Sequence, residues 1–499
     1  MTREEIQNLI SQAADKLRRD GLSVSDYIDE IAWLLFLRSL EAREKDRQVE
    51  AELAEKPYIP ILEEEYRWST WAQGDLTGDE LMRFVTEELF PYLQQLQGNA
   101  ERERIRIIFQ ALSRPRSRSG YTLKDVINLV DKIDFLKAED VYALSLVYEE
   151  LLKEMGTAAG LAGEFYTPRH LVRFIVEMAE PTDRDTVYDP CMGTGGFLVG
   201  AFEWVKREVG QALTGEAYQA LQKRYVGREK NPRTYLLGLM NLLLHGLSEA
   251  QVYVGNTLNQ NVMDPGLPRY SLILTNPPFG GEEHRSVQQN FPYRTAATEA
   301  LFLQHILRSL APGGRAAVIL PEGILFRGGV IEQIRRELVD QNRVRAIISL
   351  PPGVFLPYAG VKTNILYVEK PRSGEDSTRE VWFYEVQADG FSLTKTRKPI
   401  PENDLPEALQ LWREWVKPEK PGWQEQAATA KSWITSVEKI REAGYNLTAA
   451  HHNPHPQETL EHDPPGVLLR RLLAQHEAIL EAVRDLLNLV EPEEVGANK

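Results

Sequence analysis

The first part of the chain shows the apolar spacing of helices. Apolar residues recur every three or four positions in IQNLISQAADKLR, YIDEIAWLLFLRSLEAREKD, AERERIRIIFQAL and AEDVYALSLVYEELLKEM. This spacing places them on one face of a helix. Gly156 and Gly160 then indicate a break. The pattern therefore predicts an all-helical N-terminal domain over residues 1–155.

From about residue 163 to 370 the spacing changes. Short β-branched runs alternate with helical stretches: DTVYDP, RYVGRE, QVYVGN, YSLILTN, RAAVILP, VRAIISLP and TNILYVEK. This alternation is typical of a doubly wound, parallel α/β sheet. Ligands of such sheets bind at the carboxyl ends of the strands. We expect a Rossmann-like catalytic domain over residues 156–450.

Residues 451–499 are predicted to form a tail that contains one helix, at 466–491. Its apolar positions follow a 3-4 spacing with one histidine among them: Leu469, Leu472, His476, Ile479, Val483, Leu486 and Val490. A heptad seam of this kind favours docking onto a helix of another chain. Packing of the seam onto the chain's own catalytic domain is the alternative.

Composition narrows the classes of function. The chain has 499 residues, a formal net charge of -15 and one cysteine, Cys191. A single cysteine excludes internal disulfides and a cysteine-rich zinc site. No apolar run is long enough for a membrane span, and the N-terminus lacks a secretory signal, so we expect a cytoplasmic protein without membrane contact. Tight binding of DNA by this acidic chain alone is not expected.

Three glycines, Gly193, Gly195 and Gly196, lie between a strand that leads to Asp189 and a helix that starts near Phe197. Glycines at such a turn let the backbone approach a ligand closely. The G-T-G-G spacing departs from the dinucleotide fingerprint, which argues against a dehydrogenase, and no P-loop is present. Glu229 ends the next strand and suits the ribose hydroxyls of an adenosine-containing cofactor.

The strand SLILT leads into Asn276, Pro277, Pro278 and Phe279. The Asn276 amide oxygen and the Pro277 carbonyl can accept both hydrogens of one amino group. The prolines fix φ and preorganise these acceptors, and Phe279 offers a ring for stacking. This arrangement predicts a clamp for an amino group on a planar ring. Cys191 is interpreted as a packing residue and not as a nucleophile.

These motifs carry a resemblance to a known family. DPCMGTGGF followed by TNPPFG resembles the N6-adenine DNA methyltransferases that use S-adenosylmethionine, and GEFYTPRHLVRFIVEM resembles the motif that opens their γ-ordered members. The fuller resemblance is to the modification (M) subunit of type I restriction–modification systems. It extends through the N-terminal helices and through GREKNPRTYLLGLMNLLLHG, APGGRAAVILPEGILF, SLPPGVFLPYAGVKTNILY and AGYNLTAAHHNP. The resemblance implies a methyltransferase sheet and site-specific methylation of adenine N6.

The resemblance also implies cofactor contacts. The methionine end of S-adenosylmethionine would be lined by Glu164, Phe165, Tyr166, Thr167, Pro168 and Arg169. The backbone of the glycine turn, Gly193, Thr194, Gly195 and Gly196, would wrap the cofactor. Asp189 would face its amino or methionine portion, and Glu229 its ribose. Where the family usually has an aspartate for the adenine amino group, this chain has Asn256, whose amide oxygen accepts the same bond without charge.

Partners follow from the same resemblance. The stretch after Lys370 leaves little room for a domain that reads bases, so a separate specificity (S) subunit is expected on the C-terminal helix, with two M subunits per S. A restriction (R) subunit is compatible with this reading, and double-stranded DNA is the substrate. Arg114, Arg116 and Arg118 are interpreted as a solvated loop, with a contact to DNA phosphates as the alternative.

Two alternatives to DNA methylation stay open. The same clamp serves methylation of a protein glutamine or of RNA. A catalytically silent assembly subunit is the other alternative. No metal site is expected, although His451, His452, His455 and His462 cluster near the tail.

Overall fold

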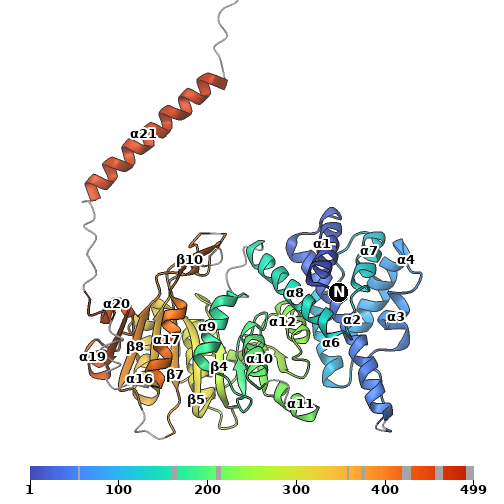
Figure 1. The fold of residues 1–499 in the computed structure, drawn as a ribbon, viewed down its shortest axis with the longest axis horizontal. Coiled ribbons are helices and arrows are strands. Elements are labelled where there is room, and N and C mark those ends of the chain that lie inside the picture. Colours follow the sequence, from blue (N-terminus) through green and yellow to red (C-terminus); the bar gives the residue numbers. More distant parts are fainter. Residues whose placement is uncertain are drawn as a thin grey trace, which may run out of the picture. The chain divides into compact units, whose positions relative to one another are not determined.

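The computed structural model describes the chain except residues 54, 56, 159–165, 210–214, 357–358, 373–376, 395, 418–428, 456–464 and 491–499. The chain divides into two compact units, Met1–His452 and Asn453–Lys499 (Figure 1). The three domain boundaries predicted from the sequence stay predictions. No helix in the described residues is long and apolar enough to cross a membrane.

The first unit begins with helices. They are α1 (Arg3–Arg19), α2 (Val24–Leu53), η1 (Glu64–Tyr66), α3 (Trp68–Trp71), α4 (Gly78–Arg83), η2 (Phe84–Leu89), α5 (Phe90–Gln95), α6 (Ala100–Leu112), α7 (Gly120–Val130) and α8 (Ala138–Ala158). The four predicted helices correspond to α1, α2, α6 and α8. The break expected at Gly156 is wrong, because α8 continues through it. Gly160 lies outside the described residues.

A nine-stranded sheet follows. The strands of the unit are β1 (Val187–Asp189), β2 (Tyr225–Glu229), β3 (Gln251–Val254), β4 (Tyr270–Thr275), β5 (Leu310–Pro321), β6 (Arg343–Ser349), β7 (Thr363–Glu369), β8 (Glu380–Glu385) and β11 (Ser432–Ser436), with a separate hairpin of β9 (Asp389–Phe391) and β10 (Pro399–Asn403). Their order in the sheet is β11-β8-β6-β7-β5-β4-β1-β2-β3. All seven predicted strands are present.

The sheet is mixed, which corrects the expectation of a purely parallel one. β7 runs antiparallel to both of its neighbours, β5 and β6, and β11 runs antiparallel to β8. The other contacts in the sheet, including those among β3, β2, β1, β4 and β5, are parallel. The parallel half therefore presents five neighbouring carboxyl ends at one edge, and the chemistry-bearing residues follow four of them, β4, β1, β2 and β3.

Alternate residues of the strands pack into two different cores. Leu272, Leu274 and Ile365 belong to one core, and Ile273 and Leu366 to the other. A strand buried on both faces reads as a continuous apolar run, as YSLILT does. The helices that follow α8 in this unit are α9 (Arg169–Ala179), α10 (Gly196–Val209), α11 (Glu216–Gln222), α12 (Pro232–Leu244), η4 (Thr257–Asn259), α13 (Arg285–Gln288), α14 (Thr298–Ser309), α15 (Glu322–Phe326), α16 (Val330–Gln341), α17 (Leu405–Val416), α19 (Val437–Glu442) and α20 (Ala449–His452).

Helix α12 joins the helical region to the sheet. It contacts β2 and β3 on one side and α2, α6 and α8 on the other (Figure 1). Arg233, in its first turn, donates from Nε to Asp29 Oδ1 at 2.7 Å and from Nη2 to the Ser25 carbonyl at 2.9 Å. Because these contacts lie beside one continuous apolar core, the helical region gives α12 a fixed support.

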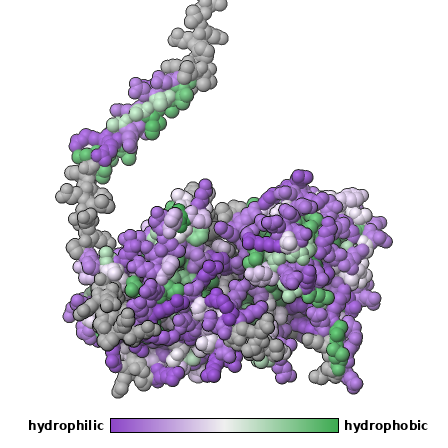
Figure 2. All heavy atoms as spheres, viewed as in Figure 1, coloured by the Kyte–Doolittle hydropathy of each residue, from purple (hydrophilic) through white to green (hydrophobic). Residues whose placement is uncertain are grey.

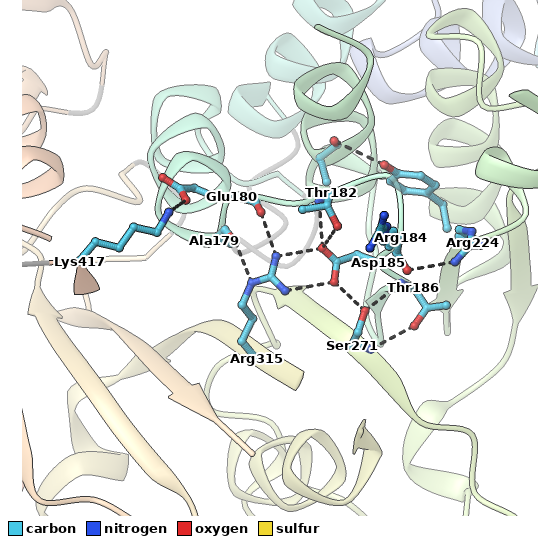
Figure 3. A network of polar contacts seen from close by, with 12 residues as sticks. Ala179, Glu180, Thr182, Arg184, Asp185, Thr186, Arg224, Ser271, Arg315 and Lys417 are labelled. Atoms are coloured by element: carbon cyan, nitrogen blue, oxygen red, sulfur yellow. Dashed lines mark hydrogen bonds and ion pairs between the residues drawn. The ribbon is translucent and has the colours of Figure 1, made fainter. Parts of the chain in front are cut away.

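Arg315 of β5 organises the opposite, amino end of the sheet (Figure 3). Its guanidinium donates to the carbonyls of Ala179 and Glu180 and to both carboxylate oxygens of Asp185 at 3.1 and 3.0 Å. Asp185 also accepts from Ser271 Oγ at 2.7 Å. Burial opposes ionisation of Asp185, but Arg315 and these hydrogen bonds hold its pKa down at about 2. The network ties the end of α9 to β4 and β5.

The second unit contains one described helix, α21 (Pro465–Val490), as predicted. Most of its described apolar side chains are exposed; Leu469, Leu472 and Ile479 keep 62%, 66% and 61% of their surface. Figure 2 shows apolar surface running along the helix. A stripe of this length on a single helix has the form of a surface that another helix covers.

Candidate active site

The site lies where four neighbouring parallel strands end. β4, β1, β2 and β3 lie side by side in this order. Asp189 and Glu229 are the last residues of β1 and β2, Asn276 follows β4, and Asn256 follows β3 by two positions. Parallel strands end at the same edge of a sheet, so the fold brings these four polar side chains together.

The glycine turn requires its glycines. Gly193 and Gly195 have φ of 53° and 76°, a region that favours glycine, and α10 begins at Gly196. A Cβ on Gly196 would clash with Nη1 of Arg169, so any other residue there would push that guanidinium aside. Glu229 holds the turn: its Oε2 accepts from the N–H of Gly193 at 3.0 Å.

Asn276 is oriented by a single hydrogen bond. Its Nδ2 donates to Oγ1 of Thr167 at 3.2 Å, and this bond turns Oδ1 away from Thr167. Oδ1 is buried and has no hydrogen-bond partner within the described part of the chain. A buried acceptor without a partner is costly and marks a place where a ligand completes the site. This atom is the acceptor that the sequence predicts for an amino group.

A narrow cavity of about 20 Å³ connects Asn276 with the glycine turn. It is lined by Thr167, Arg169, Asp189, Cys191, Met192, Gly193, Thr194, Gly196, Phe197 and Asn276. The structure thus brings together seven of the residues that the sequence assigned to catalysis or to the cofactor, together with Cys191.

Arg169 lines this cavity and has an N–H donor that no described residue accepts. Its Nε is 2.9 Å from Oε1 of Glu149, and its guanidinium lies 5.1 Å from the ring centre of Tyr166. Nη2 is buried and makes no hydrogen bond to any described residue. A guanidinium in this state has a donor free for a carboxylate.

A wider cavity of about 440 Å³ opens beside the first. Its lining is Pro190, Cys191, Glu229, Lys230, Asn231, Gly255, Asn256, Thr257, Pro278, Gly281, Glu282, Glu283, Thr298 and Phe302. Glu229 and Asn256, which the sequence assigned to the adenosine half of a cofactor, line this cavity together with Pro278 of the proposed clamp. Cys191 lines both cavities and so lies where the two meet.

Asp189 is almost completely buried at the junction. Its Oδ1 accepts from Oγ1 of Thr275 at 2.7 Å and from the N–H of Cys191 at 3.2 Å. Burial raises the pKa of Asp189 to about 7, and the nearby charge of Glu229 adds to the rise. A cation in the cavity would favour its ionised form. Burial also raises the pKa of the Cys191 thiol, which supports a packing role.

The other predicted residues lie around these cavities. Pro168 precedes the first turn of α9, Pro277 is buried, and half-buried Phe279 meets the buried ring of Phe355 edge-on at 5.9 Å. Glu164 and Phe165 lie outside the described residues. The assignment of individual side chains to the cofactor or to catalysis stays a prediction.

Sequence reasoning missed several residues that the fold adds to the site. Lys230, Glu283, Phe302 and Phe355 were given no role. Lys230 directly follows Glu229, so its position at the end of β2 could have been predicted from the sequence. Glu283 and Phe302 come from a polar segment and from α14, and no local spacing marks them. Phe355 stands in the SLPPGVFLPYAG stretch, where only the family resemblance drew attention to it.

Two further groups of residues lie outside the site. The loop with Arg114, Arg116 and Arg118 is pinned by its backbone: the N–H of Arg116 donates to Glu30 at 2.8 Å and that of Arg118 to Asp20 at 2.8 Å. No group of three metal-ligating side chains occurs in the described residues. Of the four histidines near the tail, His462 lies outside the described residues.

Comparison with known proteins identifies the family. The N-6 DNA Methylase model matches residues 139–461, and the HsdM N-terminal domain model matches residues 6–130. The Escherichia coli type I restriction enzyme EcoEI methylase subunit is 34% identical over 99% of this chain and 100% of its own length. The EcoKI methylase subunit of Escherichia coli K12 is 31% identical over 81% of this chain and 75% of its own.

Solved structures agree and confirm the expected fold class. A chain from a structure of a type I restriction–modification (R-M) system, which describes complex assembly and conformational transition, superposes with a TM-score of 0.83 at 41% identity, covering 99% of this chain and 100% of that one. A modification subunit of a putative type I restriction enzyme from Vibrio vulnificus YJ016 superposes with a TM-score of 0.74 at 35% identity over 92% and 99%. The chain therefore belongs to the N-6 DNA methylase family and, within it, groups with the methylase subunits of type I restriction enzymes.

Proposed function

We propose that this chain transfers the methyl group of S-adenosylmethionine to the N6 amino group of an adenine in double-stranded DNA, as the modification subunit of a type I complex. The observation that carries the proposal is Oδ1 of Asn276, which is buried, has no hydrogen-bond partner among the described residues and lines the same cavity as the glycine turn. A cytoplasmic location is part of the proposal.

The residues present fit S-adenosylmethionine. The wider cavity offers Glu229 for ribose hydroxyls and Asn256 near the adenine end. The narrow cavity offers Arg169, with a free donor, for the methionine carboxylate, and Asp189 for the methionine ammonium. The glycine turn lets the backbone lie against the ligand between them. When bound, S-adenosylmethionine supplies an electrophilic methyl group on a sulfonium centre.

The chain's own part is to hold the amino group of the base. Oδ1 of Asn276 accepts one of its N–H bonds, and the main-chain carbonyl of Pro277 accepts the other. With both hydrogens engaged, the nitrogen lone pair is less delocalised into the ring and attacks more readily. Pro277 and Pro278 keep these acceptors in place before the base arrives, so the contribution is positioning and electrostatics. The adenine must leave its duplex to reach them.

Asp189 and Thr167 prepare the site. Thr167 fixes the Asn276 amide through its Oγ1, so that the oxygen and not the nitrogen faces the base. Asp189, whose pKa of about 7 leaves it partly protonated in the free chain near neutral pH, ionises fully when an ammonium group is bound beside it.

The partners belong to the proposal as well. The exposed seam of α21 is suited to a helical specificity subunit, with two modification subunits on each one. That chain reads the sequence, and a restriction subunit completes the complex. Arg114, Arg116 and Arg118, on a loop held by buried Glu30 and by Asp20, contribute contacts to DNA phosphates.

Modification mapping tests the proposed function. A host without endogenous DNA methylation would express this chain together with its specificity subunit, and its DNA would be sequenced by a method that detects modified bases. N6-methyladenine at one recurring sequence is expected, and it should vanish when the modification gene is removed. Methylation of RNA or of protein glutamine, with unmodified DNA, would contradict the proposal.

A further inference from the structure

The wider cavity must satisfy the amino group of any adenine that it buries. An amino group enclosed without an acceptor loses its bonds to water and gains nothing in return. Of the carboxylates and amides that line it, Glu282 is exposed and Oδ1 of Asn231 caps α12 by accepting the N–H of Arg233, which leaves Glu229, Asn256 and Glu283.

Two of these acceptors are already engaged by the backbone. Oδ1 of Asn256 accepts the N–H of Leu258 at 3.0 Å, and Nδ2 of Asn256 points the other way, to Oε2 of Glu283 at 3.3 Å. The two carboxylate oxygens of Glu229 accept the N–H groups of Gly193 at 3.0 Å and Asn231 at 2.8 Å. Glu229 also stands at the end of β2, where a ribose is expected.

Glu283 differs from Asn256 and Glu229 because its carboxylate contacts side chains and not backbone N–H groups. Its side chain is 10% exposed, and its nearest cation, Nζ of Lys230, lies 3.5 Å from Oε1 on a side chain that is 67% exposed. An exposed lysine at this distance neutralises little of the charge. Each oxygen of the Glu283 carboxylate accepts one hydrogen bond from a side chain, Oε1 from Lys230 and Oε2 from Asn256. Each oxygen keeps a second acceptor site for a ligand.

The backbone fixes Glu283 in this place. Its N–H donates to the carbonyl of Ala296 at 2.9 Å, and its own carbonyl accepts from Nε2 of Gln288 at 2.9 Å. The neighbouring pair Glu282 and Ala297 forms an antiparallel bridge. These contacts hold the carboxylate at the cavity before any ligand enters, so little ordering is needed on binding.

We propose that the carboxylate of Glu283 accepts the hydrogen bond of the exocyclic amino group of the cofactor's adenine and selects for that amino group. The inference rests on the proposed function, because it takes an adenosine cofactor for granted. A carboxylate is only an acceptor, so it pairs with an amino group and repels a carbonyl at the same position of the purine. It also supplies beside Asn256 the negative charge that an amide lacks, and Asn256 becomes the residue that positions it.

The test compares two ligands that differ at this one position of the purine. S-adenosylhomocysteine carries the amino group, and S-inosylhomocysteine carries a carbonyl there. Their dissociation constants would be measured by calorimetry with wild-type chain, Glu283→Gln and Glu402→Gln. Glu402 is the control, because it is an exposed glutamate in β10 and does not line the cavity.

The wild type and Glu402→Gln should prefer the adenosyl ligand strongly. In Glu283→Gln, binding of the adenosyl ligand should weaken about tenfold while binding of the inosyl ligand stays or improves, because glutamine can donate to the carbonyl. The ratio of the two constants does not depend on the folded fraction. An unchanged ratio in Glu283→Gln would overturn the inference, whereas a wild type that binds neither ligand would instead overturn the proposed function.

Discussion

At the scale of single residues, orientation matters as much as identity. An asparagine after a strand could present either its oxygen or its nitrogen to a ligand, and the sequence does not say which. The bond from Asn276 Nδ2 to Thr167 settles it, over a separation of 109 positions. The sequence thus predicted the acceptor, but the group that aims it became visible only in the fold.

Thr167 gives the first prediction. Thr167→Val keeps the shape but removes the oxygen that accepts from Asn276, so the amide can rotate and kcat should fall about five- to tenfold. Thr167→Ser keeps the oxygen and should retain most of the activity. Affinity for S-adenosylhomocysteine, measured by calorimetry, should change less than kcat in both. Equal kcat in the valine and serine variants would show that Thr167 does not orient the amide.

Asp189 gives a prediction about pH. Because its pKa is about 7 in the free chain, it is largely protonated on the acidic side and must ionise to pair with the ligand's ammonium. Affinity for S-adenosylhomocysteine should therefore rise about tenfold from about pH 6 to about pH 8, since ionisation of a group with a raised pKa is linked to binding. Calorimetry on Asp189→Asn should give a nearly flat profile. A wild-type profile as flat as that of the variant would rule out this linkage.

At the scale of elements, the apolar periodicity of the sequence predicted where the strands lie along the chain better than it predicted their direction in the sheet. The apolar runs of all seven expected strands form strands, because buried strands carry continuous β-branched runs whatever their direction. TNILYVEK gives no sign that β7 runs antiparallel between β5 and β6. Likewise, the mixed stretch after Lys370 hid β8 and β11, whose pairing joins segments far apart in the chain.

Arg315 tests how the elements are joined. Arg315→Met leaves the carboxylate of Asp185 buried without its cation, which should lower the free energy of unfolding by about 3 kcal/mol. Arg343→Met is the control, since Arg343 is half exposed and its pair with Glu369 is 3.6 Å long. Urea denaturation would compare them.

The same variant gives a signed pH dependence. The pKa of Asp185 lies near 2 in the folded chain, below its ordinary value, so its stabilising effect is present above about pH 4. The stability difference between wild type and Arg315→Met should therefore shrink as the pH falls from about 4 toward 2. A difference that stays constant over this range would mean that the ion pair contributes little.

At the scale of the whole molecule, the net charge and the exposed seam of α21 both indicate that other subunits contribute to DNA binding and assembly. A net charge of -15 does not favour phosphate contacts by the chain alone. The seam of α21 was readable from heptad spacing, because that spacing depends only on neighbours along the chain. The occupant of the seam is not readable in this way, because it belongs to another molecule.

Assembly can be tested on the seam. Leu472→Gln with Ile479→Gln keeps helix-forming side chains but removes the apolar surface, and should weaken co-purification with the specificity subunit while S-adenosylhomocysteine still binds. Glu477→Gln with Glu481→Gln, which leaves the seam apolar, is the matched control. Retained assembly in the first pair would place the interface elsewhere on the chain.

The most direct test is the methyl-transfer rate of the Asn276→Ala complex, measured beside its affinity for S-adenosylhomocysteine. The amide oxygen is proposed to touch only the base, so transfer to DNA should fall to background while the affinity stays within about twofold of the wild type. Transfer at a rate near that of the wild type would contradict the role given to Asn276, and so would a loss of affinity as large as the loss of rate.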